Sequence, residues 1–128
     1  MNIFVETIKK DPDFIGSNGR SEEKILRAEA TLGVHFAEDY HAYLKEIGLA
    51  SFDGRELTGL TEDVRLDVVC VTKEQRKRVA QVPAGWYVVE EANIDGIVVW
   101  QDSDGTVYAT QPKRKNQKIA NSLLEYIS

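Results

Sequence analysis

GWYVVEEANIDGIVVWQDSDGTVYATQ, residues Gly85–Gln111, decides the fold of this chain. Its β-branched and aromatic residues are typical of strands. Its two turn sequences, Asp95-Gly96 and Asp102-Ser103-Asp104-Gly105, are typical of tight hairpins, because glycine accepts the positive φ that such turns require. The stretch therefore predicts three strands, at Trp86–Glu91, Ile97–Gln101 and Thr106–Gln111.

The middle strand is apolar without alternation from Ile97 to Trp100. A strand with one solvated face alternates apolar and polar residues, so this strand is expected to be covered on both faces. Trp100 should then be largely buried, and helices from the rest of the chain must supply the cover.

The rest of the chain predicts mainly helices. Tyr40, Tyr43, Leu44 and Ile47 recur at helical spacing, which is the clearest amphipathic pattern in the sequence. Three helices are predicted at Asn2–Lys10, Ala37–Ile47 and Gln117–Ile127. Two more are predicted from their ends: one is capped by Ser21 and ended by Gly33, and the other is capped by Thr72 and ends before Pro83. Two further strands are predicted at Glu56–Thr58 and Leu66–Thr72. This order predicts one α+β domain over residues 1–128, with an N-terminal αα-hairpin, a mostly antiparallel sheet and a C-terminal helix.

The composition predicts a protein of the cytoplasm. At 128 residues the chain is long enough to bury a core, and no apolar run approaches the about 20 residues of a membrane helix. The first residues place acids and lysines after a short apolar stretch, which is the wrong order for a signal peptide. The single cysteine, Cys70, cannot form an internal disulfide. We expect no membrane partner.

The net charge of −5 is unevenly distributed. No Lys or Arg lies between Arg78 and Lys113, and that interval holds five acids: Glu90, Glu91, Asp95, Asp102 and Asp104. Phosphate contacts dominate nucleic-acid binding, so this distribution argues against nucleic acid as a ligand and favours a basic protein partner. A solvated surface that keeps the protein soluble is the simpler reading of the same acids.

The sequence contains no recognisable catalytic or metal-binding motif. A metal site at His35 and His41 would need further ligands, for which Glu38 and Asp39 are candidates, but zinc sites usually recruit several His or Cys at set spacing and this is not such a pattern. We expect both histidines at the surface or at a helix end. Cys70 lies in an apolar run and is expected to be buried and inert. Glu90 and Glu91 are adjacent in a predicted strand and should point to opposite faces. We expect no catalytic residues, no metal and no cofactor, and therefore no enzyme.

Three passages resemble the SUKH superfamily, domains related to a fungal cell-wall assembly regulator and abundant in bacteria. They are EATLGVHFAEDYHAYLKEIG at residues 29–48, ELTGL with DVVCVT at residues 56–72, and WQDSDGTVYA with the closing SLLEYI at residues 100–127. One departure is Ala37, where the family usually has proline at the first helical turn. The resemblance implies an αα-hairpin on a curved, mostly antiparallel sheet and no catalytic apparatus.

The resemblance also implies a role in bacterial competition, because many bacterial members are immunity proteins, antitoxins that bind and inhibit a cognate toxin. We expect a toxin partner with a basic surface, such as a nuclease. The candidate partner-binding residues are Glu56, Tyr87, Glu90, Glu91, Asp95, Asp102, Asp104 and Tyr108, with one of the tyrosines as an apolar anchor. Only some of the acids can share one face, and the basic helix around Arg76–Arg78 is the alternative surface. A regulatory interaction module without a toxin, and a hydrolase that uses Asp or Glu, are the competing hypotheses.

Overall fold

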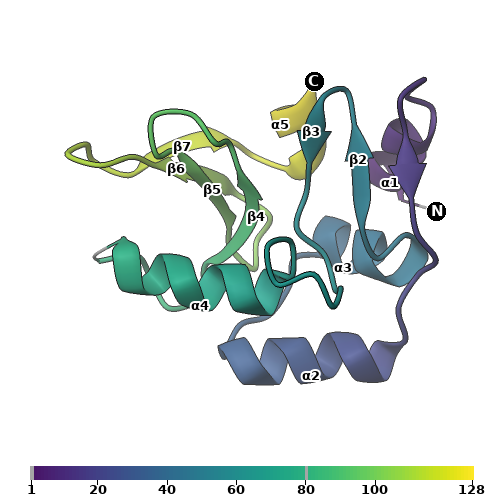
Figure 1. The fold of residues 1–128 in the computed structure, drawn as a ribbon, viewed down its shortest axis with the longest axis horizontal. Helices are drawn as coiled ribbons and strands as arrows, with labels where there is room; N and C mark the ends of the chain where they lie inside the picture. Colours follow the sequence, from purple (N-terminus) through teal and green to yellow (C-terminus); the bar gives the residue numbers. More distant parts are fainter. Residues whose placement is uncertain (1, 80) are drawn as a thin grey trace.

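The computed structural model describes residues 2–79 and 81–128 of the chain. Its helices are α1 (Ile3–Lys9), α2 (Glu22–Leu32), α3 (Glu38–Glu46), α4 (Val68–Arg78) and α5 (Leu123–Ile127), and its strands are β1 (Ile15–Gly16), β2 (Ala50–Phe52), β3 (Arg55–Glu56), β4 (Tyr87–Glu91), β5 (Val98–Gln101), β6 (Val107–Thr110) and β7 (Gln117–Ala120). The strands form two antiparallel sheets, β1-β2-β3 and β4-β5-β6-β7, so the predicted α+β class is confirmed (Figure 1).

The three strands predicted from Gly85–Gln111 are observed as β4, β5 and β6, three consecutive strands of the larger sheet, each within about one residue of its expected start. Asp95 and Gly96 both have positive φ, 54° and 70°, as the tight turn between β4 and β5 requires. Trp100 lies opposite Val88 on one side and Tyr108 on the other.

Both faces of this sheet are covered, as the apolar run of β5 predicted. Tyr87 and Val99 face a main core that includes α1 and α3, whereas Val88 and Trp100 face α4 and pack with its Val71. Figure 1 shows α4 lying along one side of the sheet. Trp100 is fully buried, which confirms the expectation for the middle strand.

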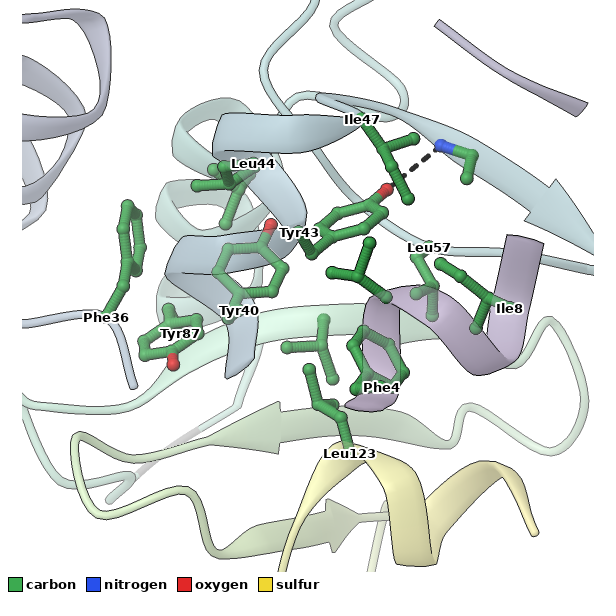
Figure 2. Close-up of a cluster of buried hydrophobic side chains, with 14 of the residues drawn as sticks. Phe4, Ile8, Phe36, Tyr40, Tyr43, Leu44, Ile47, Leu57, Tyr87 and Leu123 are labelled. Carbon is green, nitrogen blue, oxygen red and sulfur yellow. Dashed lines mark hydrogen bonds between the residues drawn. The ribbon is translucent and has the colours of Figure 1, made fainter. Parts of the chain in front are cut away.

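The αα-hairpin is formed by α2 and α3. Ser21 caps α2 by accepting a hydrogen bond from the Lys24 amide, and Gly33 ends the helix with φ of 68°. Tyr40 and Tyr43 of α3 are fully buried at the centre of the core (Figure 2). The Tyr43 hydroxyl accepts a hydrogen bond from the Ala50 amide at 3.0 Å and so fixes the chain where β2 begins.

The prediction of a strand at Leu66–Thr72 is wrong, because this segment opens helix α4. Asp67 caps the helix by accepting a hydrogen bond from the Cys70 amide at 3.2 Å. Val68, Val71, Thr72 and Gln75 are buried, which is helical spacing. A short apolar run fits a buried strand and a buried helix equally well by composition, and here the helix prevails.

Two further expectations fail with that strand. Cys70 lies on the solvent side of α4 and is exposed rather than buried. Thr72 does not cap a helix: it lies inside α4, where its hydroxyl accepts a hydrogen bond from the Val88 amide of β4 at 3.0 Å.

The prediction of one helix over Gln117–Ile127 is also wrong in its first half. Residues Gln117–Ala120 form strand β7, which pairs with β6, and only Leu123–Ile127 is helical. Ser122 caps α5 by accepting from the Glu125 amide. Ile119, which the helical pattern placed toward the sheet, is 42% exposed on the edge strand.

In the smaller sheet, the turn at Asp53-Gly54 joins β2 to β3. The strand predicted at Glu56–Thr58 is observed one to two residues earlier, at Arg55–Glu56, and the short strands β1 and β2 were not predicted. Leu57 and Thr58 instead are buried beside β4, where the Thr58 amide donates to the Val89 carbonyl at 2.9 Å.

Candidate functional site

The candidate acids lie at opposite ends of the larger sheet. Glu91 and Asp95 lie at and beyond the end of β4, and a small hollow joins Glu91 to Glu56 of β3. Asp102 and Asp104 lie in the turn between β5 and β6. Since a strand rises about 3.3 Å per residue, the span from Ile97 through β5 to Asp102 is roughly 16 Å long, with Asp95 before one end and Asp102 at the other. The acids therefore form two surfaces and not one.

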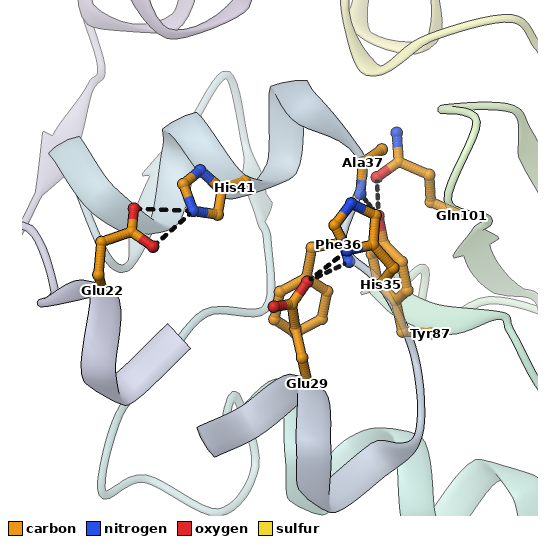
Figure 3. Close-up of polar contacts among 8 residues, drawn as sticks. All are labelled: Glu22, Glu29, His35, Phe36, Ala37, His41, Tyr87 and Gln101. Carbon is orange, nitrogen blue, oxygen red and sulfur yellow. Dashed lines mark hydrogen bonds and ion pairs between the residues drawn. The ribbon is translucent and has the colours of Figure 1, made fainter. Parts of the chain in front are cut away.

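Tyr87, a candidate anchor, is fully buried and holds the start of α3 in place. Its hydroxyl donates to Gln101 Oε1 at 2.6 Å and accepts from the Ala37 amide at 2.8 Å (Figure 3). Burial raises the pKa of this phenol well above its ordinary value, so the group stays protonated. A partner arriving at the surface does not reach Tyr87.

Glu90 is buried as well, in a network that joins β4 to α5 and to the β2–β3 hairpin. The Tyr126 hydroxyl donates to its carboxylate, the Arg55 guanidinium lies 4.0 Å away, and Arg55 also lies over the Tyr126 ring at 5.3 Å. Burial raises the pKa of Glu90 despite these partners. Its contacts within the fold leave Glu90 little surface for a partner.

A β-bulge decides which face each of these two glutamates takes. The register of β4 against β5 shifts between Val88 and Glu90. Glu90 consequently lies on the same side as the preceding Val89, toward α5, and Glu91 turns toward α4, where Gln75 donates to its carboxylate at 2.5 Å. The two glutamates do lie on opposite faces, as expected from their adjacency.

The acids at the other end gather around the start of α3, and we call this group the acidic end: Glu38, Asp39, Asp102 and Asp104. Glu38, Asp39 and Asp104 line a shallow hollow of about 190 Å³. Within residues 2–79 and 81–128, no member of the acidic end forms an ion pair with a cationic side chain. The acidic end thus presents uncompensated negative charge to solvent.

Local hydrogen bonds fix the acidic end. Asp102 Oδ1 accepts from the amides of Asp104 and Thr106, both at 3.0 Å, as expected of a turn aspartate. Asp39 accepts from Gln101 Nε2 at 2.9 Å and from the Leu123 amide at 3.0 Å, so it ties α3 to β5 and to the start of α5. From the sequence, Glu38 and Asp39 were considered only as candidate metal ligands beside the histidines and were not predicted as partner-binding residues; acids in the first turn of a helix are already explained by the helix dipole.

Tyr108 is half-buried beside the acidic end. Its ring stacks on Trp86 with centroids 4.0 Å apart, and its hydroxyl donates to Asp102 Oδ2 at 2.9 Å. Of the two candidate anchors, Tyr108 is the one that solvent reaches.

The histidines lie at the surface, as expected. His35 is exposed with Nδ1 3.3 Å from Glu29, and His41 contacts Glu22 at 2.9 Å (Figure 3). In the part of the chain that the structure describes, no group of three or more His, Cys, Asp or Glu could hold a metal ion. Desolvation and the Asp67 carboxylate raise the pKa of the Cys70 thiol, which disfavours the nucleophilic thiolate.

Comparison with known proteins supports the resemblance drawn from the three quoted passages. A SUKH family model described as "SMI1-KNR4 cell-wall" matches residues 1–128. No curated protein matches the chain. None of the helices within the described residues has the length and apolar character needed to cross a bilayer.

Proposed function

This chain belongs to the SUKH superfamily, whose model matches all of its residues, and from that membership we propose that it is an immunity protein that binds and neutralises a cognate bacterial toxin. The superfamily includes toxin-immunity proteins, and membership is the observation that carries the proposal. Inhibition is stoichiometric: the protein covers the toxin and performs no reaction on it.

The acidic end supports a toxin with a basic surface. An enzyme that cleaves nucleic acid holds phosphates with Lys and Arg, so a protein that occludes its active site gains from uncompensated carboxylates. Glu38 and Asp104 are exposed and form no ion pair with the other described residues. The half-buried ring of Tyr108 lies on β6, the strand that follows the turn containing Asp104. Glu56, by contrast, is already paired with Arg65 at 3.3 Å.

The proposal is tested by measuring association with the toxin encoded beside this gene, as a function of salt. Glu38→Lys with Asp104→Lys is expected to slow association by about tenfold at low salt and to flatten the salt dependence, because charge steering acts mainly on the association rate. Glu62→Lys with Asp13→Lys is the matched control, since both residues are exposed acids outside the acidic end and the pair changes the net charge by the same amount.

If the reversals leave the rate and its salt dependence as in the wild type, the acidic end is not the contact surface. If the wild-type protein neither binds nor inhibits the neighbouring toxin, the immunity proposal fails, and a regulatory interaction module becomes the better reading of the family.

A further inference from the structure

A further hollow lies at the other end of the sheet from the acidic end. It has a volume of about 580 Å³ and lies between the C-terminal end of α4, the β4–β5 turn and the tip of the β6–β7 hairpin. Figure 1 shows this hairpin extending past the rest of the sheet on the side where α4 ends. We call this hollow the α4–hairpin groove.

Cationic side chains form the rim of the groove. Arg78 comes from α4, and Lys113 and Arg114 come from the hairpin, with Lys115 next in the chain; all four are exposed. Among the described residues, Arg78 has only the exposed Glu74 as an ion-pair partner, at 3.3 Å. The three hairpin bases form no ion pair with any residue in the ranges 2–79 and 81–128. The positive charge of the rim is therefore available to a ligand.

The groove is apolar between these cations. Val79, Ile97, Val98 and Pro112 line it, and they offer a surface for an aliphatic side chain. No aromatic ring is among the described residues that line the groove. Single-stranded nucleic acid is held mainly by stacking its bases on aromatic side chains, so the lining disfavours a nucleic acid in spite of the positive rim.

Glu91 is the one carboxylate among the described lining residues. Gln75 holds it at 2.5 Å, and it forms no ion pair with Arg78, Lys113 or Arg114 at the rim. Among the described residues, Lys113 and Arg114 therefore have no carboxylate partner, and Glu91 gives the groove an internal group whose charge opposes that of an anionic ligand.

We propose that the α4–hairpin groove binds an acidic, extended segment of a protein partner, with its carboxylates on the cationic rim and an aliphatic side chain against the apolar lining. This contact is independent of the proposed toxin contact, because the acidic end lies at the opposite end of β5. Each can fail without the other.

The experiment measures fluorescence polarisation of a labelled peptide of glutamates flanking one leucine, with oligothymidylate as the competing anion. Lys113→Glu with Arg114→Glu should weaken peptide binding by about tenfold or more, since repulsion replaces attraction. Lys9→Glu with Lys10→Glu is the matched control, because these adjacent bases are also exposed but lie at the C-terminal end of α1. Glu91→Gln should tighten binding, because it removes the opposing charge and keeps an oxygen for Gln75.

Replacing the leucine of the peptide by serine should weaken binding if the apolar lining is occupied. The proposal is overturned if both pairs of reversals weaken binding equally, if Glu91→Gln weakens it, or if oligothymidylate binds more tightly than the peptide. Equal effects of the two pairs would mean that the peptide responds to charge anywhere on the surface.

Discussion

Tyr87→Phe removes one oxygen atom from the interior and tests how the start of α3 is held. The hydroxyl has two partners, the Ala37 amide and Gln101 Oε1, and all three residues are buried. The phenylalanine ring keeps the contacts with Phe36 and Tyr40, whose centroids lie 4.9 and 5.2 Å away. The substitution therefore changes hydrogen bonding and almost nothing else.

The expected cost follows from the two groups left without a partner. Each unsatisfied buried group costs about 1–3 kcal/mol, so with partial relaxation we expect Tyr87→Phe to lower the free energy of unfolding by about 2–4 kcal/mol. Tyr40→Phe is the matched control. Tyr40 is equally buried, but its hydroxyl bonds only Thr58 Oγ1, which also donates to the Val88 carbonyl. Loss of the Tyr40 hydroxyl should lower the free energy of unfolding by about 0.5–1.5 kcal/mol.

Urea denaturation followed by tryptophan fluorescence measures both variants. The midpoint of Tyr87→Phe should fall clearly further than that of Tyr40→Phe, with the slope unchanged, because the same surface is exposed on unfolding. If the two midpoints fall equally, the Tyr87 hydroxyl does not hold α3 as described. A displaced α3 would also move Glu38, so toxin association at low salt gives a second readout.

Three further predictions concern stability. Trp100→Ala should lower the free energy of unfolding by about 3–5 kcal/mol, the usual cost of emptying a large aromatic site, and a near-wild-type midpoint in urea would show that β5 is not central. Asp67→Ala should cost about 1–2 kcal/mol in the same assay, because it uncaps α4 and frees the Thr61 amide, whereas Asp63→Ala serves as the exposed control. Because burial raises the pKa of Glu90, its contribution to stability is greatest below the unfolded pKa of a glutamate and is lost as pH rises through the folded pKa. The melting temperature of the wild type should therefore fall as the pH is raised through this range, and that of Glu90→Gln should fall less. If the melting temperatures of variant and wild type change in parallel with pH, this assignment is contradicted.

Strong local signals made most of the fold predictable. The Asp-Gly turns at Gly96 and Gly105 and the apolar run between them predicted β4, β5 and β6. The helical spacing of Tyr40 and Tyr43 predicted α3 and with it the αα-hairpin. The failures come from segments whose local signal is ambiguous. Residues 67–72 are apolar enough for either a strand or a helix, and burial against β4 decides for the helix. Ile119 matches a helical stripe, but pairing with β6 draws its segment into the sheet.

The candidate site was less predictable than the fold, because its residues depend on contacts between distant segments. Nothing local to Tyr87 shows that its hydroxyl meets Ala37, fifty positions away in the chain. Acidity by itself also could not separate Glu90, which is buried against Tyr126, from Asp104, which is exposed. Arg78 belongs to the basic helix noted in the sequence, but only the fold brings it to Lys113 and Arg114 of the hairpin.

The bulge in β4 reverses the face of the sheet on which each following side chain lies. With a regular strand, alternation from Val88 would turn Glu90 toward α4 and Glu91 toward α5, so the groove would contain the other glutamate. A relative of equal length whose β4 runs without the bulge would exchange the surroundings of the two glutamates, although its sequence of acids is the same. A sequence alignment of such chains would then pair a residue that faces α4 with one that faces α5. An alignment based on which face of the sheet each side chain occupies would pair the equivalent residues.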